Sequence, residues 1–142
     1  MRILFIVGPA LGHIGRALVV ARQLKTLGNT DIAFSCPARP NGMHTRLLAP
    51  EFPVIELPAD NPGGCDIGFA EALERVMADF SADLIVCDLS PLPWLPLIRF
   101  PQTPRAYLTN VFLIALGSRK TVQDTLWEQH GTRWNSLRQR RG

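Results

Sequence analysis

Apolar residues along the chain follow two alternating patterns: short continuous runs and stretches with helical spacing. Continuous runs rich in branched residues are typical of strands that helices cover on both faces of a parallel sheet. These runs predict five strands, at residues 3–7, 31–35, 54–57, 84–87 and 105–109. Asp88 closes the fourth of them.

Amphipathic helices are predicted between the strands. The first follows the turn at residues 8–12, and its apolar stripe consists of Ile14, Ala17, Leu18, Ala21, Leu24 and Leu27. The opposite, solvent-facing side of this helix carries Arg16, Arg22, Gln23 and Lys25. Gly28 can serve as its C-terminal stop. A second long helix is expected at residues 69–80 and a short one at 43–48, with more helical material at 121–129 and 134–140.

This alternation of strands and helices predicts an α/β fold with right-handed crossovers. We expect a doubly wound, Rossmann-like parallel sheet of strand order 3-2-1-4-5, in a single domain that spans residues 1–142. The length suits one compact core, because 46% of the residues are hydrophobic and 19% are charged.

The apolar runs are far shorter than the roughly 20 residues that a membrane-spanning helix needs. The N-terminus also lacks the apolar core and the cleavage site of a secretory signal. We therefore expect a cytoplasmic protein without a membrane span, while contact with a membrane surface stays open.

Charge and cysteine content argue against several classes of function. The net charge is only +3, and much of the basic excess lies at residues 133–141, so no nucleic-acid partner is expected. Cys36, Cys65 and Cys87 are odd in number and widely spaced, which favours neither a disulfide framework nor a zinc site. We expect reduced, mostly buried thiols and no metal.

Two candidate catalytic residues follow predicted strand ends. In open α/β sheets, ligands bind beyond the carboxyl ends of the strands, where the strand order reverses. That crevice lies between the first and fourth strands, which lead to His13 and Asp88. A carboxylate bonded to one imidazole nitrogen stabilises the cation that forms when the other nitrogen takes a proton. Singly, each residue fits a helix start or a turn cap; together they predict a general-base pair.

The segments around this pair resemble a known family. Residues 8–24, with Gly12-His13 before a helix rich in alanine and leucine, resemble the opening of UDP-glycosyltransferases of the GT-B architecture and of the related peptidoglycan N-acetylglucosaminyltransferases. Residues 82–94 resemble a second motif of these enzymes, and residues 134–142 resemble the segment that leads into their interdomain linker. The resemblance spans the chain, and the first two motifs are its specific part.

This resemblance implies the acceptor-binding, N-terminal half of an inverting glycosyltransferase. Such an enzyme uses a nucleotide-sugar, here UDP-linked, as co-substrate and no other cofactor. The resemblance makes His13 the base that activates an acceptor hydroxyl and Asp88 its partner. Candidate acceptor-binding residues lie beside His13 or beyond the fourth and fifth strands: Gly12, Ile14, Ser90, Trp94, Asn110 and Phe112.

The chain also departs from the family pattern. Many members carry a proline shortly after the Gly-His pair, where this chain has Gly15 and Arg16, so lipid-linked or polysaccharide acceptors stay open beside small molecules. The donor-binding, C-terminal half has no counterpart within residues 1–142. We therefore expect the chain to be inactive alone and to need a donor-binding half, from the same gene or a separate chain.

Two other functions stay open. Gly8, Gly12 and Gly15 follow a strand and open a helix, as in a dinucleotide-binding domain. The first two of these glycines are four positions apart instead of two, and no acidic residue ends the second strand. The other alternative is a Rossmann-like interaction domain without enzymatic activity. His44 and His130 have no partner at the spacing of a metal site or a dyad, so no role is predicted for them.

Overall fold

The strands of the protein form a single parallel sheet. The computed structural model describes residues 1–59, 67–88 and 97–108. Its five strands are β1 (Arg2–Val7), β2 (Asp31–Pro37), β3 (Val54–Leu57), β4 (Leu84–Asp88) and β5 (Arg105–Leu108). Their order is β3-β2-β1-β4-β5, and each neighbouring pair is parallel. The predicted α/β fold and strand order, with β1 between β2 and β4, are confirmed.

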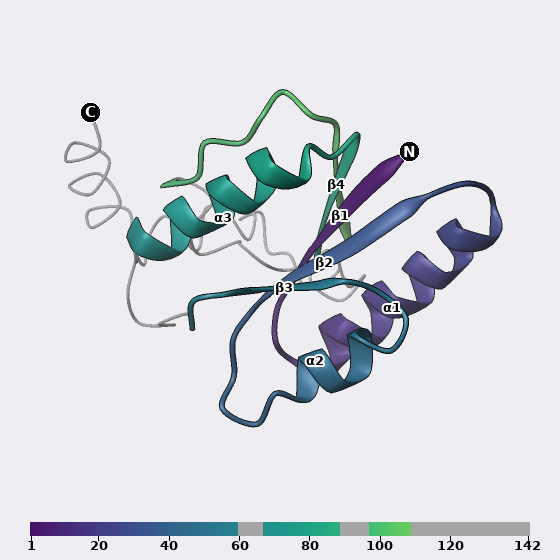
Figure 1. Ribbon diagram of the computed structural model, residues 1–142, viewed down its shortest axis with the longest axis horizontal. Coiled ribbons are helices and arrows are strands. Elements are labelled where there is room, and N and C mark those ends of the chain that lie inside the picture. The colour runs from purple at the N-terminus through teal and green to yellow at the C-terminus, as the bar shows by residue number, and fades with distance from the viewer. Residues whose placement is uncertain (60–66, 89–96, 109–142) are drawn as a thin grey trace, which may run out of the picture.

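Helices cover both faces of this sheet. The chain forms α1 (Leu11–Thr26), α2 (Met43–Leu48) and α3 (Ile67–Phe80). Figure 1 shows α3 on one side of the strands and α1 with α2 on the other, as in a doubly wound fold. Within the described ranges, no helix is long and apolar enough to cross a membrane.

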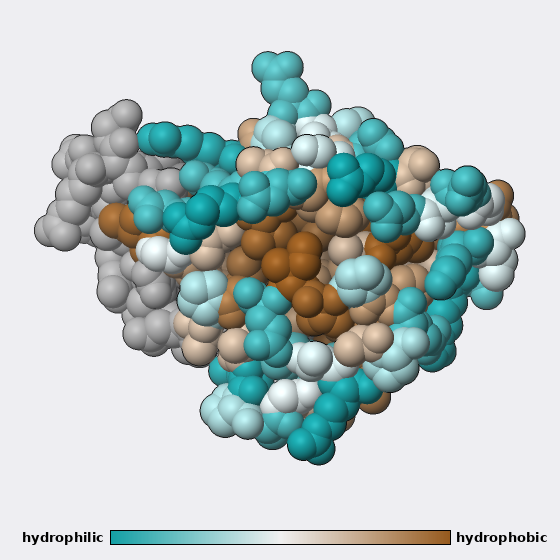
Figure 2. All heavy atoms as spheres, in the orientation of Figure 1, coloured by the Kyte–Doolittle hydropathy of each residue, from teal (hydrophilic) through white to brown (hydrophobic). Residues whose placement is uncertain are grey.

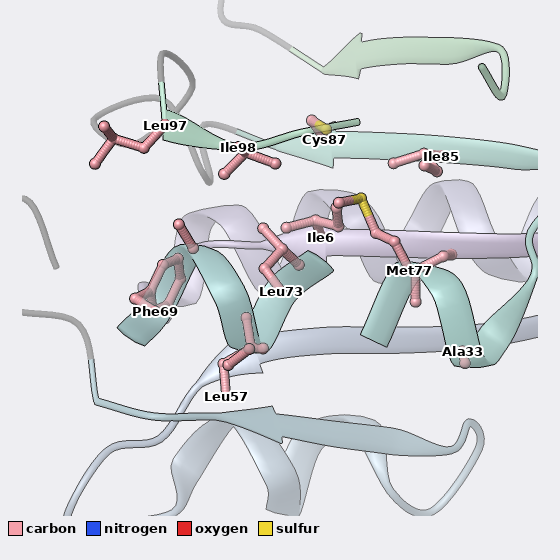
Figure 3. Close-up of a cluster of buried hydrophobic side chains, with 13 residues drawn as sticks. Ile6, Ala33, Leu57, Phe69, Leu73, Met77, Ile85, Cys87, Leu97 and Ile98 are labelled. Carbon is pink, nitrogen blue, oxygen red and sulfur yellow. The ribbon is translucent and has the colours of Figure 1, made fainter. Parts of the chain in front are cut away.

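The core consists of two apolar layers, one on each face of the sheet. Residues 3–7 of β1 are fully buried, which explains why this run is apolar without alternation. Leu4 and Ile6 pack on the side of α3, whereas the other residues of the run pack on the side of α1 and α2. In Figure 3, Leu73 and Met77 of α3 point toward the sheet.

The apolar core comes close to the surface at one edge of the sheet. There β3 is the last strand of the described sheet, and its residues Val54 and Ile55 are only partly buried. Figure 2 shows apolar residues in the middle of the face on which β3 lies in Figure 1, with hydrophilic residues above and below them.

In some details the structure differs from the predicted elements. β2 continues to Pro37, two residues beyond its predicted end, because it pairs with β3 up to that point. Leu27, predicted on the apolar stripe of the first helix, is 81% exposed, since α1 ends before it. Thr109 of the fifth predicted strand and the helical segments at 121–129 and 134–140 lie outside the described residues.

Two of the three cysteines are free and buried, as predicted. They are Cys36 on β2 and Cys87 on β4, and burial raises the pKa of each thiol to about 12. Cys65 lies outside the described residues.

We expect both buried thiols to be unreactive in the folded chain. The thiolate is the reacting form, and a pKa of about 12 leaves about one thiol in ten thousand ionised near pH 8. In a Cys65→Ser variant, a colorimetric disulfide reagent should label neither Cys36 nor Cys87 until urea unfolds the chain. Rapid labelling of either thiol without denaturant would contradict its buried position.

Candidate active site

The candidate site lies where β1 and β4 end side by side. Val7 and Asp88, the last residues of these strands, are register partners. Just beyond them, the N–H of Gly8 donates to the carbonyl oxygen of Asp88 over 3.4 Å. The chain then turns into α1, where the N–H of His13 donates to the carbonyl oxygen of Ala10 at 3.0 Å. His13 therefore lies in the first turn of a helix that starts just beyond the carboxyl end of β1.

His13 and Asp88 form the predicted pair. Nδ1 of the imidazole lies 2.9 Å from Oδ1 of the carboxylate. The Asp88 side chain is fully buried, whereas 23% of the His13 side chain is exposed. The carboxylate of Asp88 thus has no contact with solvent, whereas the imidazole of His13 is partly accessible to it.

Arg16 is a third member of this site, and the sequence analysis wrongly placed it on the solvent-facing side of the helix. Its Nε–H donates to Oδ2 of Asp88 at 2.8 Å, and its Nη2–H donates to Oδ1. Only 24% of the Arg16 side chain is exposed. The hydrogen bonds to Asp88 raise the pKa of Arg16, so its charge is permanent. The sequence signal for this third member is its spacing of three residues from His13, which puts both side chains on one helix face.

The arrangement determines which nitrogen of His13 carries the proton in the neutral ring. A carboxylate that accepts hydrogen bonds from a guanidinium has no proton to donate, so the contact of 2.9 Å requires the proton on Nδ1. Nη2 of Arg16 is 3.4 Å from the same nitrogen, but both are donors and face the shared carboxylate. The neutral ring therefore keeps Nε2 as a proton acceptor.

Gly8 leaves room for the imidazole. A Cβ atom at this position would lie 3.4 Å from Cδ2 and 3.7 Å from Cγ of His13. A methyl group at this position would therefore just touch the ring.

The structure places two of the six predicted acceptor-binding residues. Gly12 is exposed in the first turn of α1, directly before His13. Ile14 is only 1% exposed and packs in the core beneath α1, so its side chain has almost no surface to offer an acceptor. The other four residues lie outside the described ranges: Ser90, Trp94, Asn110 and Phe112.

A shallow depression, which the sequence analysis did not predict, begins at the turn that leads to His13. It has a volume of about 450 Å³ and lies between the turn after β1 and the loop after β2. Exposed apolar side chains and polar groups share its lining, which consists of Pro9, Leu11, Arg39, Pro40, Asn41 and Met43. The sequence held little signal for it, because its walls come from two loops and the first residues of the helices that follow them.

His44 has a partner, in contrast to the sequence interpretation. Its buried ring contacts Oε1 of Glu56 on β3 through Nε2 at 3.2 Å. The hydroxyl of Thr45 donates to the same oxygen at 2.6 Å. These bonds, that of Thr45 first, lower the pKa of Glu56. The cluster links α2 to β3.

In the described part of the chain, no group of three or more His, Cys, Asp and Glu side chains could hold a metal ion.

Comparisons with known proteins give matches among solved structures only. No protein-family model and no curated protein matches the sequence. UGT2 from Phytolacca americana superposes with a TM-score of 0.61 at 14% identity, over 81% of this chain and 31% of that chain. Its complex with UDP-2-fluoro-glucose and pterostilbene gives 0.61 at 17%, over 81% and 33%. The glycosyltransferase SnogD from Streptomyces nogalater gives 0.59 at 19%, over 96% and 39%.

The chain has a glycosyltransferase-like fold. It spans about a third of the length of the solved structures that it matches. The predicted Rossmann-like GT-B fold class is confirmed, whereas the relation to peptidoglycan N-acetylglucosaminyltransferases stays a prediction.

We expect the charge of Asp88 to contribute to the stability of the fold. In Asp88→Asn, an amide of similar size keeps one accepting oxygen but sets its NH2 group against a donor of Arg16, and a polar group left unsatisfied in the interior costs about 1–3 kcal/mol. Urea unfolding followed by circular dichroism measures this loss. The control is Asp31→Asn, which breaks an exposed pair with Arg2 and should cost less than about 1 kcal/mol. An Asp88→Asn chain as stable as the unmodified one would contradict the site geometry.

Proposed function

We propose that this chain is the acceptor-binding half of an inverting glycosyltransferase with His13 as its general base. The observation that carries the proposal is the hydrogen bond between His13 and the buried Asp88 at the carboxyl edge of β1 and β4. Ligands of doubly wound folds bind at this edge, where the strand order reverses. The shared fold with solved glycosyltransferases supports the reaction class.

In the proposed reaction, Nε2 of His13 accepts the proton of an acceptor hydroxyl. The hydroxyl oxygen attacks the anomeric carbon, a new C–O bond forms on the face opposite the leaving group, and the bond to the nucleoside diphosphate breaks. The diphosphate leaves with the electron pair, and the configuration inverts. Asp88 stabilises the imidazolium through Nδ1–H. Positioned general-base catalysis of this kind is worth about 10² to 10⁴ in rate.

We further propose a UDP-linked sugar as the donor, bound by a second half that belongs to the same gene or to a separate chain. The solved UGT2 complex holds UDP-2-fluoro-glucose, which supports this class of donor. A departing diphosphate needs N–H donors or a helix N-terminus directed at its developing charge. The family resemblance assigns those groups to the donor-binding half.

The depression beside the turn after β1 is the proposed start of the acceptor site. Leu11 and Met43 offer apolar contact, while Arg39 and Asn41 provide polar groups. Binding sites for small molecules commonly combine an apolar lining with a few polar groups. An acceptor with an apolar body and a hydroxyl directed at His13 matches this lining. The solved UGT2 complex also holds pterostilbene, which supports a small organic molecule as the acceptor.

We expect His13→Ala to lower kcat about 10² to 10⁴-fold in the chain combined with a matching donor-binding half, and to leave donor affinity nearly unchanged. Asp88→Asn should cause a smaller loss, because the ring keeps a hydrogen-bonding neighbour without the stabilising charge. Transfer to an alcohol acceptor and to a more acidic phenol should be compared, since the phenol depends less on a base.

Two controls belong to this assay. Asp31→Asn removes an exposed carboxylate at the amino end of β2, whereas the site lies at the carboxyl ends of the strands. This variant should leave kcat unchanged. Residues 1–142 without the donor-binding half should transfer no sugar. An unchanged kcat in His13→Ala with an alcohol acceptor would remove His13 from the chemistry and favour an interaction domain without enzymatic activity.

A further inference from the structure

We propose that Arg16 is a positioning residue that serves as the permanent counter-ion of Asp88 and thereby keeps His13 neutral. This inference rests on the proposed function, because a general base must be uncharged before the acceptor arrives. The geometry behind it, however, concerns the charge on His13 alone and can be tested without a donor or an acceptor.

Asp88 is a fully buried carboxylate. Asp88 has no exposed surface, so its negative charge must be matched by a cation inside the protein. Among the described residues, two neighbours form ion pairs with Asp88 and could provide that cation: the guanidinium of Arg16 or a protonated ring of His13. Arg16 contacts both carboxylate oxygens, and a guanidinium does not lose its proton in a protein.

The charges around His13 disfavour its protonated form. Nη2 of Arg16 lies 3.4 Å from Nδ1, so a protonated ring would stand beside another cation. His13 also lies in the first turn of α1, where the helix dipole disfavours positive charge, and no acidic residue occupies that turn. On the strands beside β4, the register partners of Asp88 are the uncharged Val7 and Leu108.

These observations assign opposing effects to the two neighbours of the ring. Asp88 favours the protonated form of His13, and Arg16 disfavours it by neutralising that carboxylate and by its own charge. Without Arg16, His13 would become the counter-ion of the buried carboxylate. A ring that is already protonated has no lone pair on Nε2 with which to accept a proton from a hydroxyl.

The test is an NMR titration of the histidine rings in the chain of residues 1–142. A His13→Asn variant identifies the signals of His13 among those of the three histidines. In Arg16→Met, which removes the charge but keeps an unbranched side chain, the titration midpoint of His13 should rise by roughly one to three pH units. Arg16→Lys keeps a cation and should restore most of the difference.

Arg22 offers a matched control on the same helix. It forms a comparable two-point pair, with Glu51, at an exposed position away from Asp88. Arg22→Met removes the same charge from α1 and should leave the midpoint of His13 in place. A general effect of helix charge would shift the midpoint equally in both variants and would overturn the proposal.

The remaining outcomes are also decisive. An unchanged midpoint in Arg16→Met, with a native amide spectrum, would overturn the counter-ion role. If that variant does not fold, Arg16→Gln carries the same test, because it keeps a donor to the carboxylate without the charge. Failure of both neutral variants to fold beside a folded Arg16→Lys would show that His13 does not replace Arg16 as the counter-ion, and it would overturn the proposal. Failure of all three would assign Arg16 to helix packing and overturn the proposal.

The titration and the transfer assay can fail independently. A raised midpoint in Arg16→Met together with an unchanged kcat in His13→Ala would keep the counter-ion and reject the glycosyltransferase mechanism. A large loss of kcat in His13→Ala with an unchanged midpoint would keep the base and reject the role of Arg16.

Discussion

A carboxylate without access to water needs both hydrogen-bond donors and positive charge, and Asp88 receives both from the beginning of α1. The imidazole of His13 and the guanidinium of Arg16 converge on it from one helix face. The same contacts hold the first turns of α1 against the end of β4, across the turn that leaves β1. The packing of α1 at the carboxyl ends of β1 and β4 and the proton position on His13 therefore both depend on one buried charge.

Sequence alone was sufficient to predict most of the described fold. Strands covered on both faces leave unbroken apolar runs, such as residues 3–7, and these runs matched β1 to β5 closely. The strand order then placed the ends of β1 and β4 together, which brought His13 and Asp88 into one site. Both predictions rest on burial, the property that a sequence records most directly.

Side-chain partners from different elements were harder to predict. The spacing of Arg16 from His13 puts both side chains on one helix face, but only the position of the β4 end relative to α1 shows that Arg16 reaches Asp88. His44 is a similar case, since its partner Glu56 belongs to a neighbouring strand. For Ile14 the prediction was wrong in the opposite sense. Its proximity in sequence to His13 suggested a place in the acceptor site, but the helical periodicity of α1 turns its side chain into the core.

The likeness to solved glycosyltransferases, at 14–19% identity, describes the backbone and leaves the chemistry to the residues of this chain. A family-like pair alone would predict a histidine assisted by an aspartate. The added guanidinium changes this balance, because it shares the charge that would otherwise stabilise the imidazolium.

The central claim is that His13 is held as a neutral ring with its proton on Nδ1 and an unprotonated Nε2. Nitrogen-15 NMR of the ring in the unmodified chain, near neutral pH, measures this directly. The account predicts one protonated nitrogen, Nδ1, coupled through a hydrogen bond to Asp88, and an Nε2 signal typical of a bare acceptor. A ring with the proton on Nε2, or with both nitrogens protonated at that pH, would contradict it.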